Sequence, residues 1–189
     1  MRAVSRKSGR DVMGEIDMTG VRRLLDVGGG PATASLTFAA ADPELQCVVF
    51  DLPETVVIAR EVIAESGLGE RVSAIEGDYF VDDFGEGFDV VYVSNIIHSI
   101  GADAIAMIYR KAAAALNPGG RIMVKDFFLD DDRCGPAWGA RFAVNMLVAT
   151  EEGQAYTRAE TIRALEDAGF TDFSIVDVAK HSQIIVGCL

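Results

Sequence analysis

The segment LLDVGGGPAT, residues 24–33, joins a short apolar run to three consecutive glycines and decides the fold. The apolar run predicts a buried strand, and the glycines let the backbone turn sharply and approach a ligand beside a helix N-terminus. A dinucleotide fingerprint G-x-G-x-x-G counted from Gly28 needs a third glycine at position 33, where Thr33 stands. Asp26, two residues before the first glycine, would repel a pyrophosphate. The loop therefore favours a zwitterionic or cationic ligand over a dinucleotide.

Outward from this loop, apolar runs of strand length alternate with segments of helical period. Such alternation predicts an α/β fold with a parallel sheet. Pro53 is expected in the first turn of a helix, and the Asn-Pro-Gly-Gly turn at 117–120 is expected to separate a helix from the next strand. The last two strands are joined by a short turn, which favours antiparallel pairing. The predicted strands are 23–27, 45–50, 72–76, 88–94, 121–128, 173–178 and 183–188, and the predicted helices are 32–41, 53–66, 103–116, 138–149 and 158–168.

Polar residues follow the second, third and fourth predicted strands where those strands end. Asp51 follows the second strand, Asp78 and Tyr79 follow the third, and Ser94 and His98 come at the end of the fourth. Parallel strands bring their carboxyl ends to one edge, where open α/β sheets bind ligands. Asp51 is placed to accept both hydroxyls of a ribose, and Asp78 to accept an adenine amino group. Turn chemistry explains any one of these residues alone, but together they favour a nucleoside-containing ligand.

The composition excludes several classes of protein. The 189 residues hold 17 Lys plus Arg and 29 Asp plus Glu, a net charge of −12, which disfavours binding to nucleic acid or to an anionic membrane. No apolar run approaches the about 18 residues of a membrane span, and no leader-like segment follows the N-terminus, so we expect a cytoplasmic protein. Three scattered cysteines and the acidic run 130–132 predict no disulfide framework and no metal site.

These segments resemble the class I S-adenosylmethionine-dependent methyltransferases, and more narrowly the small-molecule O-methyltransferase family that contains the caffeate, acetylserotonin and bacterial polyketide-type enzymes. The resemblance implies a Rossmann-like, doubly wound, mostly parallel seven-stranded sheet with an antiparallel C-terminal strand. It also implies S-adenosylmethionine as cofactor, S-adenosylhomocysteine as product and a small aromatic hydroxyl compound as acceptor. The motifs that carry it are DVGGG (26–30), FDLP (50–53), GDYF (77–80), NIIHS (95–99), LNPGGRIMVKDF (116–127), NMLV (145–148), YTRAE (156–160) and EDAGF (166–170).

The resemblance also implies roles for single residues. His98 matches the general base, which suits imidazole because it accepts a proton near neutral pH, and Asp126 occupies the place of an acid that orients it. Three residues match the family's wall of the acceptor pocket, namely Trp138, Phe142 and Met146. Their helical spacing also fits plain core packing. The cofactor contacts would be Gly28 and Gly30 on the methionine side with Asp26 beside them, Ser94 at the methionine carboxylate, Asp51 and Leu52 at the ribose and adenine, and Asp78 and Tyr79 at the adenine.

The sequence departs from the family pattern at and near the catalytic centre that the resemblance implies. Ala155 stands where a second acid would hold the imidazole, Ile100 replaces an aromatic residue, and Ala32 replaces a glycine of the first loop. These departures keep open an accessory or regulatory module that binds the cofactor with little catalysis. A nicotinamide-dependent oxidoreductase is a further alternative, disfavoured by Asp26 and Thr33.

The resemblance divides the chain into a connecting helix at residues 1–20 and a catalytic domain at 21–189. Full-length members of the family carry an N-terminal helical domain that dimerises and covers the acceptor pocket. We therefore expect a homodimer or a separate lid domain as partner, since water exclusion strengthens the electrostatics of such a site.

Overall fold

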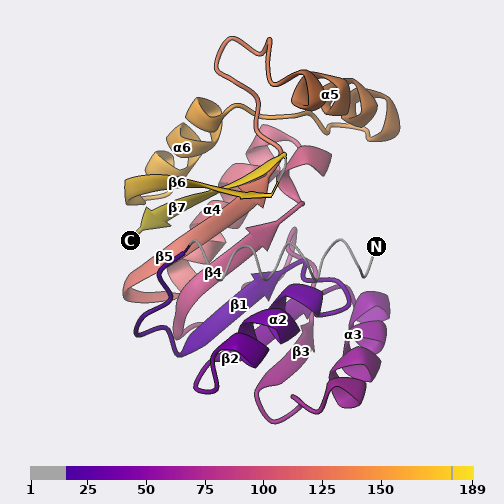
Figure 1. The fold of residues 1–189 in the computed structure, drawn as a ribbon, viewed down its shortest axis with the longest axis vertical. Helices are drawn as coiled ribbons and strands as arrows, with labels where there is room; N and C mark the ends of the chain where they lie inside the picture. Colours follow the sequence, from indigo (N-terminus) through magenta and orange to yellow (C-terminus); the bar gives the residue numbers. More distant parts are fainter. Residues whose placement is uncertain (1–15, 180) are drawn as a thin grey trace.

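The computed structural model describes residues 16–179 and 181–189, and these form one seven-stranded sheet flanked by helices (Figure 1). The predicted helix at 1–20 lies mostly outside the described residues. The strands are β1 (Arg23–Val27), β2 (Gln46–Asp51), β3 (Val72–Glu76), β4 (Phe88–Ser94), β5 (Leu116–Asp126), β6 (Thr171–Ala179) and β7 (Ser182–Cys188). The helices are α2 (Thr33–Ala41), α3 (Pro53–Ser66), α4 (Ala102–Ala115), α5 (Ala137–Ala149) and α6 (Arg158–Asp167), with a 3₁₀ turn, η1 (Ile97–Ser99).

The strand order is β3-β2-β1-β4-β5-β7-β6, which confirms the predicted doubly wound topology. The first five strands run parallel, and β7 runs antiparallel to both β5 and β6. The chain order reverses between β1 and β4, and a crevice at the carboxyl ends of strands on either side of such a reversal is where open α/β sheets bind ligands. The topology therefore places the glycine loop after β1 beside the loop after β4.

Two apolar clusters cover the two faces of the sheet. One face packs against α4 and α6, and the other packs against α2 and α3. Burial on both faces explains why β1 and β4 read as continuous apolar runs instead of alternating ones. Helix α5 lies beyond the end of the sheet, and loops join it to β5 before it and to α6 after it (Figure 1).

The helix boundaries follow the local sequence signals. Pro53 occupies the first turn of α3, and Gly67 ends that helix in the left-handed conformation with φ +74°. The fifth strand differs from the prediction at both ends. It begins at Leu116, because Leu116 pairs with Phe88 before the register shifts. It ends at Asp126 instead of residue 128. The Phe127 amide donates to the side chain of the preceding residue, Asp126 Oδ1, at 2.8 Å, so it does not continue the hydrogen bonding between strands.

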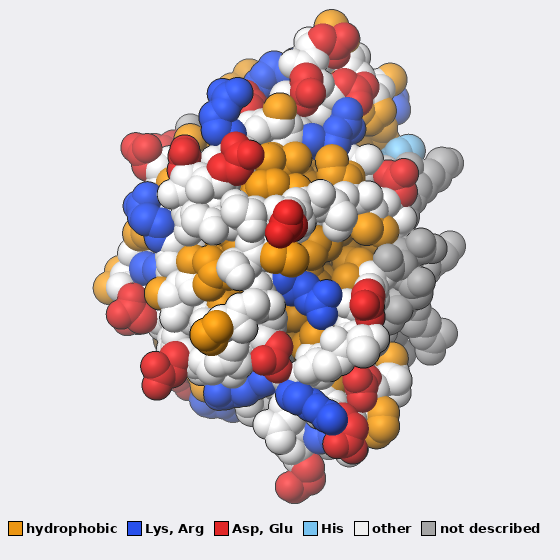
Figure 2. All heavy atoms as spheres, turned by 90° about the vertical axis from the view of Figure 1, so that its left-hand side faces the viewer, with side chains coloured by type: hydrophobic (Ala, Val, Ile, Leu, Met, Phe, Trp, Pro, Cys, Tyr) orange, Lys and Arg blue, Asp and Glu red, His pale blue; other side chains and the backbone are white. Residues whose placement is uncertain are grey.

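The surface of the described residues mixes charges of both signs. Figure 2 shows the side that carries α6 and β6, where acidic and basic side chains are interspersed among hydrophobic ones. Within residues 16–179 and 181–189, no helix is long and apolar enough to cross a membrane. The same residues contain no cluster of three or more His, Cys, Asp or Glu that could hold a metal ion.

Candidate active site

The glycine loop forms a backbone cradle at the end of β1. Gly28 and Gly30 have φ of +62° and +56°, a left-handed conformation that glycine adopts without steric cost. The Gly28 amide donates to Phe50 O at 2.8 Å, which holds the loop against the end of β2. A Cβ on Gly30 would meet no atom within 4 Å, so the loop is open on that side. Ala32, where the family pattern has glycine, is accommodated at φ +61°.

Asp26 lies under this loop. Its side chain is buried, its Oδ2 accepts from Ser35 Oγ at 2.7 Å, and a Cβ on Gly29 would lie 2.7 Å from the carboxyl group. Burial raises the pKa of Asp26 to about 7, the Ser35 hydrogen bond opposes that rise, and the charge of Asp51 adds to it. The close approach of Gly29 explains why no side chain is tolerated there. Asp26 therefore supports the loop from beneath.

Asp51 links the ends of β1 and β2. Its Oδ2 accepts from the Gly30 amide at 2.8 Å, and its Oδ1 accepts from the Leu52 amide at 2.8 Å. Each carboxylate oxygen can accept more than one hydrogen bond, so both remain able to take a hydroxyl. Leu52 is exposed at the same edge.

The turn after β3 carries Asp78 and Tyr79. Asp78 Oδ1 accepts from the Phe80 amide at 2.8 Å, and the Tyr79 ring lies 4.6 Å from the Phe80 ring. Gly77 precedes them, and a Cβ at this position would collide with the buried ring of Phe50. Burial raises the pKa of Tyr79, and the nearby charges of Asp78 and Asp51 raise it further. The structure thus brings Asp51, Asp78 and Tyr79 to one edge, as the sequence predicts.

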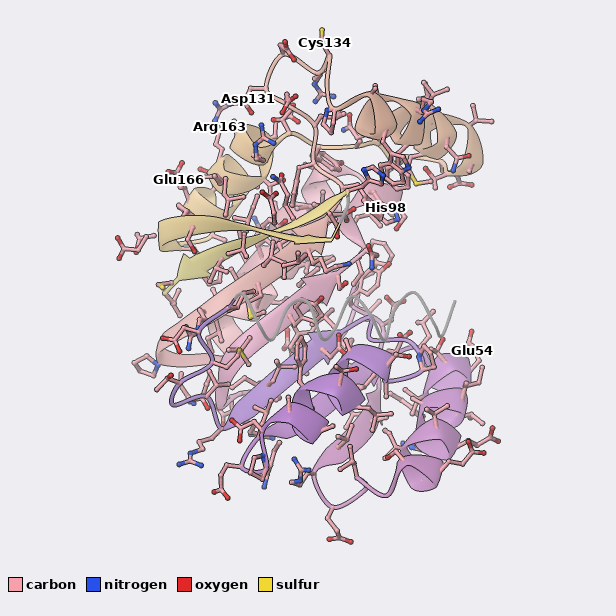
Figure 3. The ribbon with its side chains drawn as sticks, viewed as in Figure 1. Glu54, His98, Asp131, Cys134, Arg163 and Glu166 are labelled. Carbon is pink, nitrogen blue, oxygen red and sulfur yellow. The ribbon has the colours of Figure 1, made fainter. Side chains whose placement is uncertain are left out.

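His98 and Asp126 form a hydrogen-bonded pair across β4 and β5. His98 Nδ1 lies 2.7 Å from Asp126 Oδ1, with the imidazole mostly buried and the carboxyl group 2% exposed. His98 sits on η1, whose Ile97 is buried in the core, and Figure 3 shows it between the sheet and α5. A carboxylate accepts only, so His98 Nδ1 is the donor and its Nε2 carries a lone pair. Ser94, four residues earlier, lies at the end of β4, where its Oγ accepts from Asn95 Nδ2 at 3.1 Å.

The carboxyl group of Asp126 is held in a largely apolar surrounding. Its Oδ2 is buried without a hydrogen-bond partner among the described residues, and so is the Tyr109 hydroxyl. Burial raises the pKa of Tyr109 well above its ordinary value, and the charge of Asp126 raises it further. Lys125, the neighbour of Asp126, is buried as well, and that burial lowers its pKa.

Aromatic side chains line the space between His98 and α5. The His98 ring meets Phe142 edge-on at 5.0 Å, and the Trp138 ring stacks on Phe142 at 5.2 Å. Phe127 touches the same group at 4.5 Å from Trp138. The third predicted wall residue, Met146, is buried further along α5.

Sequence reasoning missed two members of this aromatic group. Phe127 follows β5 directly, and His181 lies at the turn between β6 and β7, where its ring stacks on Trp138 at 5.0 Å and 2°. Nothing in the local sequence marks either contact. Phe142 supplies the aromatic neighbour that Ile100 does not provide, and the buried Ala155 leaves Asp126 as the acid beside His98.

Comparison with known proteins places the chain in a family. The model of the O-methyltransferase domain matches residues 1–171. The chain is 34% identical over 171 residues to 3-hydroxy-5-methyl-1-naphthoate 3-O-methyltransferase of Streptomyces sahachiroi, covering 90% of this chain and 49% of that protein. It is 33% identical to the tetracenomycin polyketide synthesis 8-O-methyl transferase TcmO of Streptomyces glaucescens, covering 99% of this chain and 55% of that protein. The chain thus spans about half the length of the curated relatives it matches.

Solved structures agree with this result. Human N-acetylserotonin methyltransferase in complex with S-adenosylmethionine superposes with a TM-score of 0.90 at 28% identity, covering 99% of this chain and 53% of that one. PigF with S-adenosylhomocysteine superposes with a TM-score of 0.90 at 26% identity, covering 99% of this chain and 56% of that one. The bound molecules in these neighbours are consistent with the predicted cofactor. The chain belongs to the O-methyltransferase domain family.

Proposed function

We propose that the protein transfers the methyl group of S-adenosylmethionine to the hydroxyl of a small aromatic acceptor, with His98 as general base. The observation that carries the proposal is the 2.7 Å contact between His98 Nδ1 and Asp126 Oδ1, with the His98 ring against Phe142 at 5.0 Å. Two relatives are named for methyl transfer to oxygen, one of them on a hydroxynaphthoate, which supports the same reaction class.

The residues at the sheet edge fit the cofactor. The loop is open on one side of Gly30, and we assign this side, together with Ser94, to the amino-acid end of the cofactor. Asp51 and Asp78 are acceptors, which suits the donors of a ribose and of an adenine amino group, and Leu52 and Tyr79 offer apolar surface to the ring. The cluster of carboxylates also suits a positively charged sulfonium.

The His98 and Asp126 pair can activate an acceptor hydroxyl. Bound S-adenosylmethionine supplies a methyl group already activated by its sulfonium. The protein must align the acceptor oxygen with that carbon and remove the oxygen's proton. His98 Nε2 takes the proton, and the Asp126 carboxylate stabilises the imidazolium that forms while holding the ring in place.

The aromatic side chains near His98 indicate the shape of acceptor that the site favours. The rings of Phe127, Trp138 and Phe142 pack on one another, and Phe142 meets His98 edge-on, so a planar ring is preferred there over a flexible aliphatic alcohol. One relative is named a naphthoate O-methyltransferase, and hydroxynaphthoates are therefore the first probes to use.

The test is turnover of a panel of phenols and hydroxynaphthoates, followed as S-adenosylhomocysteine release. For an acceptor that is turned over, His98→Gln is expected to lower kcat by roughly 10²–10⁴-fold, the usual contribution of a general base. Asp126→Asn is expected to lower kcat as well, because a neutral amide does not stabilise the positively charged imidazolium as a carboxylate does. Both variants should keep the affinity of the wild type for S-adenosylhomocysteine.

Two outcomes would redirect the proposal. Equal rates for wild type and His98→Gln would exclude His98 as the base, and would favour carbon methylation, for which one relative is named L-tyrosine C(3)-methyltransferase. Cofactor binding without turnover of any acceptor would favour the accessory module that Ala155 also allows.

A further inference from the structure

A cation on α4 reaches the turn that carries the adenine contacts. Lys111 Nζ donates to Tyr79 O at 2.9 Å and to Asp82 O at 2.8 Å. The same ammonium lies 5.9 Å from the centre of the Phe84 ring. Lys111 lies in the last turns of α4, and no sequence motif connects it with the cofactor.

The turn has few other supports. The amide of Asp78 donates to Asp82 Oδ2 at 2.8 Å, and the amides of Val81 and Asp82 donate to Asp78 O at 2.9 and 2.7 Å. These bonds close the turn on itself. Among the side chains that the structure describes, only Lys111 ties residues 78–82 to another element by hydrogen bonds.

The charge of the turn makes this tie more important. Residues 78, 82 and 83 are all aspartates, and Phe80 and Val81 are exposed. Three carboxylates in one short segment repel one another, and an ammonium bonded to two of its carbonyls offsets that repulsion. Without Lys111, the position of the Asp78 carboxyl group and of the Tyr79 ring is set by the turn alone.

We propose that Lys111 is a positioning residue for the adenine end of the cofactor. It acts through the backbone of the turn, so that Asp78 and Tyr79 stand ready before the cofactor arrives. A preordered turn needs no ordering on binding, and this raises affinity. The proposal rests on the proposed cofactor site, and it extends that site to a helix on the opposite side of the turn.

The test compares two ligands by calorimetric titration of the intact chain. S-adenosylhomocysteine offers an amino group to Asp78, whereas S-inosylhomocysteine presents a carbonyl oxygen there and should bind more weakly to the wild type. Lys111→Met is expected to weaken S-adenosylhomocysteine binding by roughly tenfold, as expected for a lost charged hydrogen bond, and to shrink the preference between the two ligands. Lys111→Arg, which keeps the charge and the donors, is expected to retain most of both.

Controls separate positioning from general destabilisation. Arg110→Met removes the neighbouring exposed cation of α4 and should leave both affinities unchanged. If Lys111→Met does not fold at the titration temperature, Lys111→Gln is measured in its place. Unchanged affinity, or equal weakening of both ligands with the preference kept, would overturn the proposal. A wild-type chain that binds no S-adenosylhomocysteine would instead contradict the cofactor site itself.

Discussion

At the scale of a single residue, the burial of Asp26 beneath the glycine loop makes the stability of the protein depend on pH. Its folded-state pKa of about 7 lies above the ordinary value of 3.8, because burial disfavours the charged carboxylate. Between these two values the folded protein holds a proton that the unfolded chain has released. Its contribution to stability is therefore full below pH 3.8 and is lost as the pH rises toward 7.

This linkage gives a measurable pH dependence. Between pH 3.8 and about 7, the unfolding free energy of the wild type should fall by roughly 1.4 kcal/mol per pH unit because of Asp26. Asp26→Asn keeps an acceptor for Ser35 but does not titrate, so this decline should be absent in the variant. Urea unfolding of both proteins from pH 4 to pH 7.5 measures the difference. Parallel profiles for Asp26→Asn and the wild type would show that Asp26 is ionised throughout.

Single residues of the site differ in how far the sequence predicts them. Asp51 ends β2, and Asp78 and His98 lie within a few residues of the ends of β3 and β4, so the alternation of elements is enough to bring them to one edge. His181 meets Trp138 only because the β6–β7 turn folds back beside α5. Lys111 likewise requires the packing of α4. Contacts made by tertiary folding leave no local signal in one sequence.

Helix α6 is an element whose start is fixed by its own sequence. Thr157 Oγ1 accepts from the Glu160 amide at 3.1 Å, and Glu160 Oε2 accepts from the Thr157 amide at 2.9 Å, which completes a capping box. Glu160 also pairs with Arg133, and Arg158 Nη2 donates to Asp130 Oδ1 at 2.7 Å. The cap therefore also holds the loop that leads into α5.

Removing this cap should destabilise the protein. Thr157→Ala is expected to lower the free energy of unfolding by about 1 kcal/mol, because the Glu160 amide loses its acceptor. Thr157→Ser keeps the hydroxyl and should retain most of that stability, as urea unfolding would measure. Equal losses for Ala and Ser would assign the effect to packing of the buried Thr157 methyl group instead.

At the scale of elements, type and order are predicted better than ends. Gly67 and Pro53 mark their boundaries because each residue has a backbone preference that acts locally. The end of β5 depends on a hydrogen bond from the Phe127 amide to the Asp126 side chain instead of to a neighbouring strand. The spacing of apolar residues in the sequence does not reveal which of these acceptors the amide uses. The 3₁₀ turn that carries His98 also went unpredicted, since three residues are too few to show a period.

At the scale of the whole molecule, helix α5 presents apolar side chains to solvent. Val144, Leu147 and Val148 of α5 are exposed, and the chain spans about half the length of the relatives it matches. The expectation that a homodimer partner or a separate lid domain covers the acceptor side stays a prediction. The carboxyl ends of β1, β2 and β3, where we place the cofactor, do not depend on α5 for support, because these strands are hydrogen-bonded neighbours in the sheet.

The central claim is that this edge of the sheet binds S-adenosylmethionine and its product instead of a dinucleotide. Calorimetric titration of the chain with S-adenosylhomocysteine and with NAD⁺ tests it most directly. We expect one S-adenosylhomocysteine per chain, loss of that binding in Asp51→Ala, and no measurable heat with NAD⁺. Preferential binding of NAD⁺, or S-adenosylhomocysteine binding that survives Asp51→Ala unchanged, would contradict it.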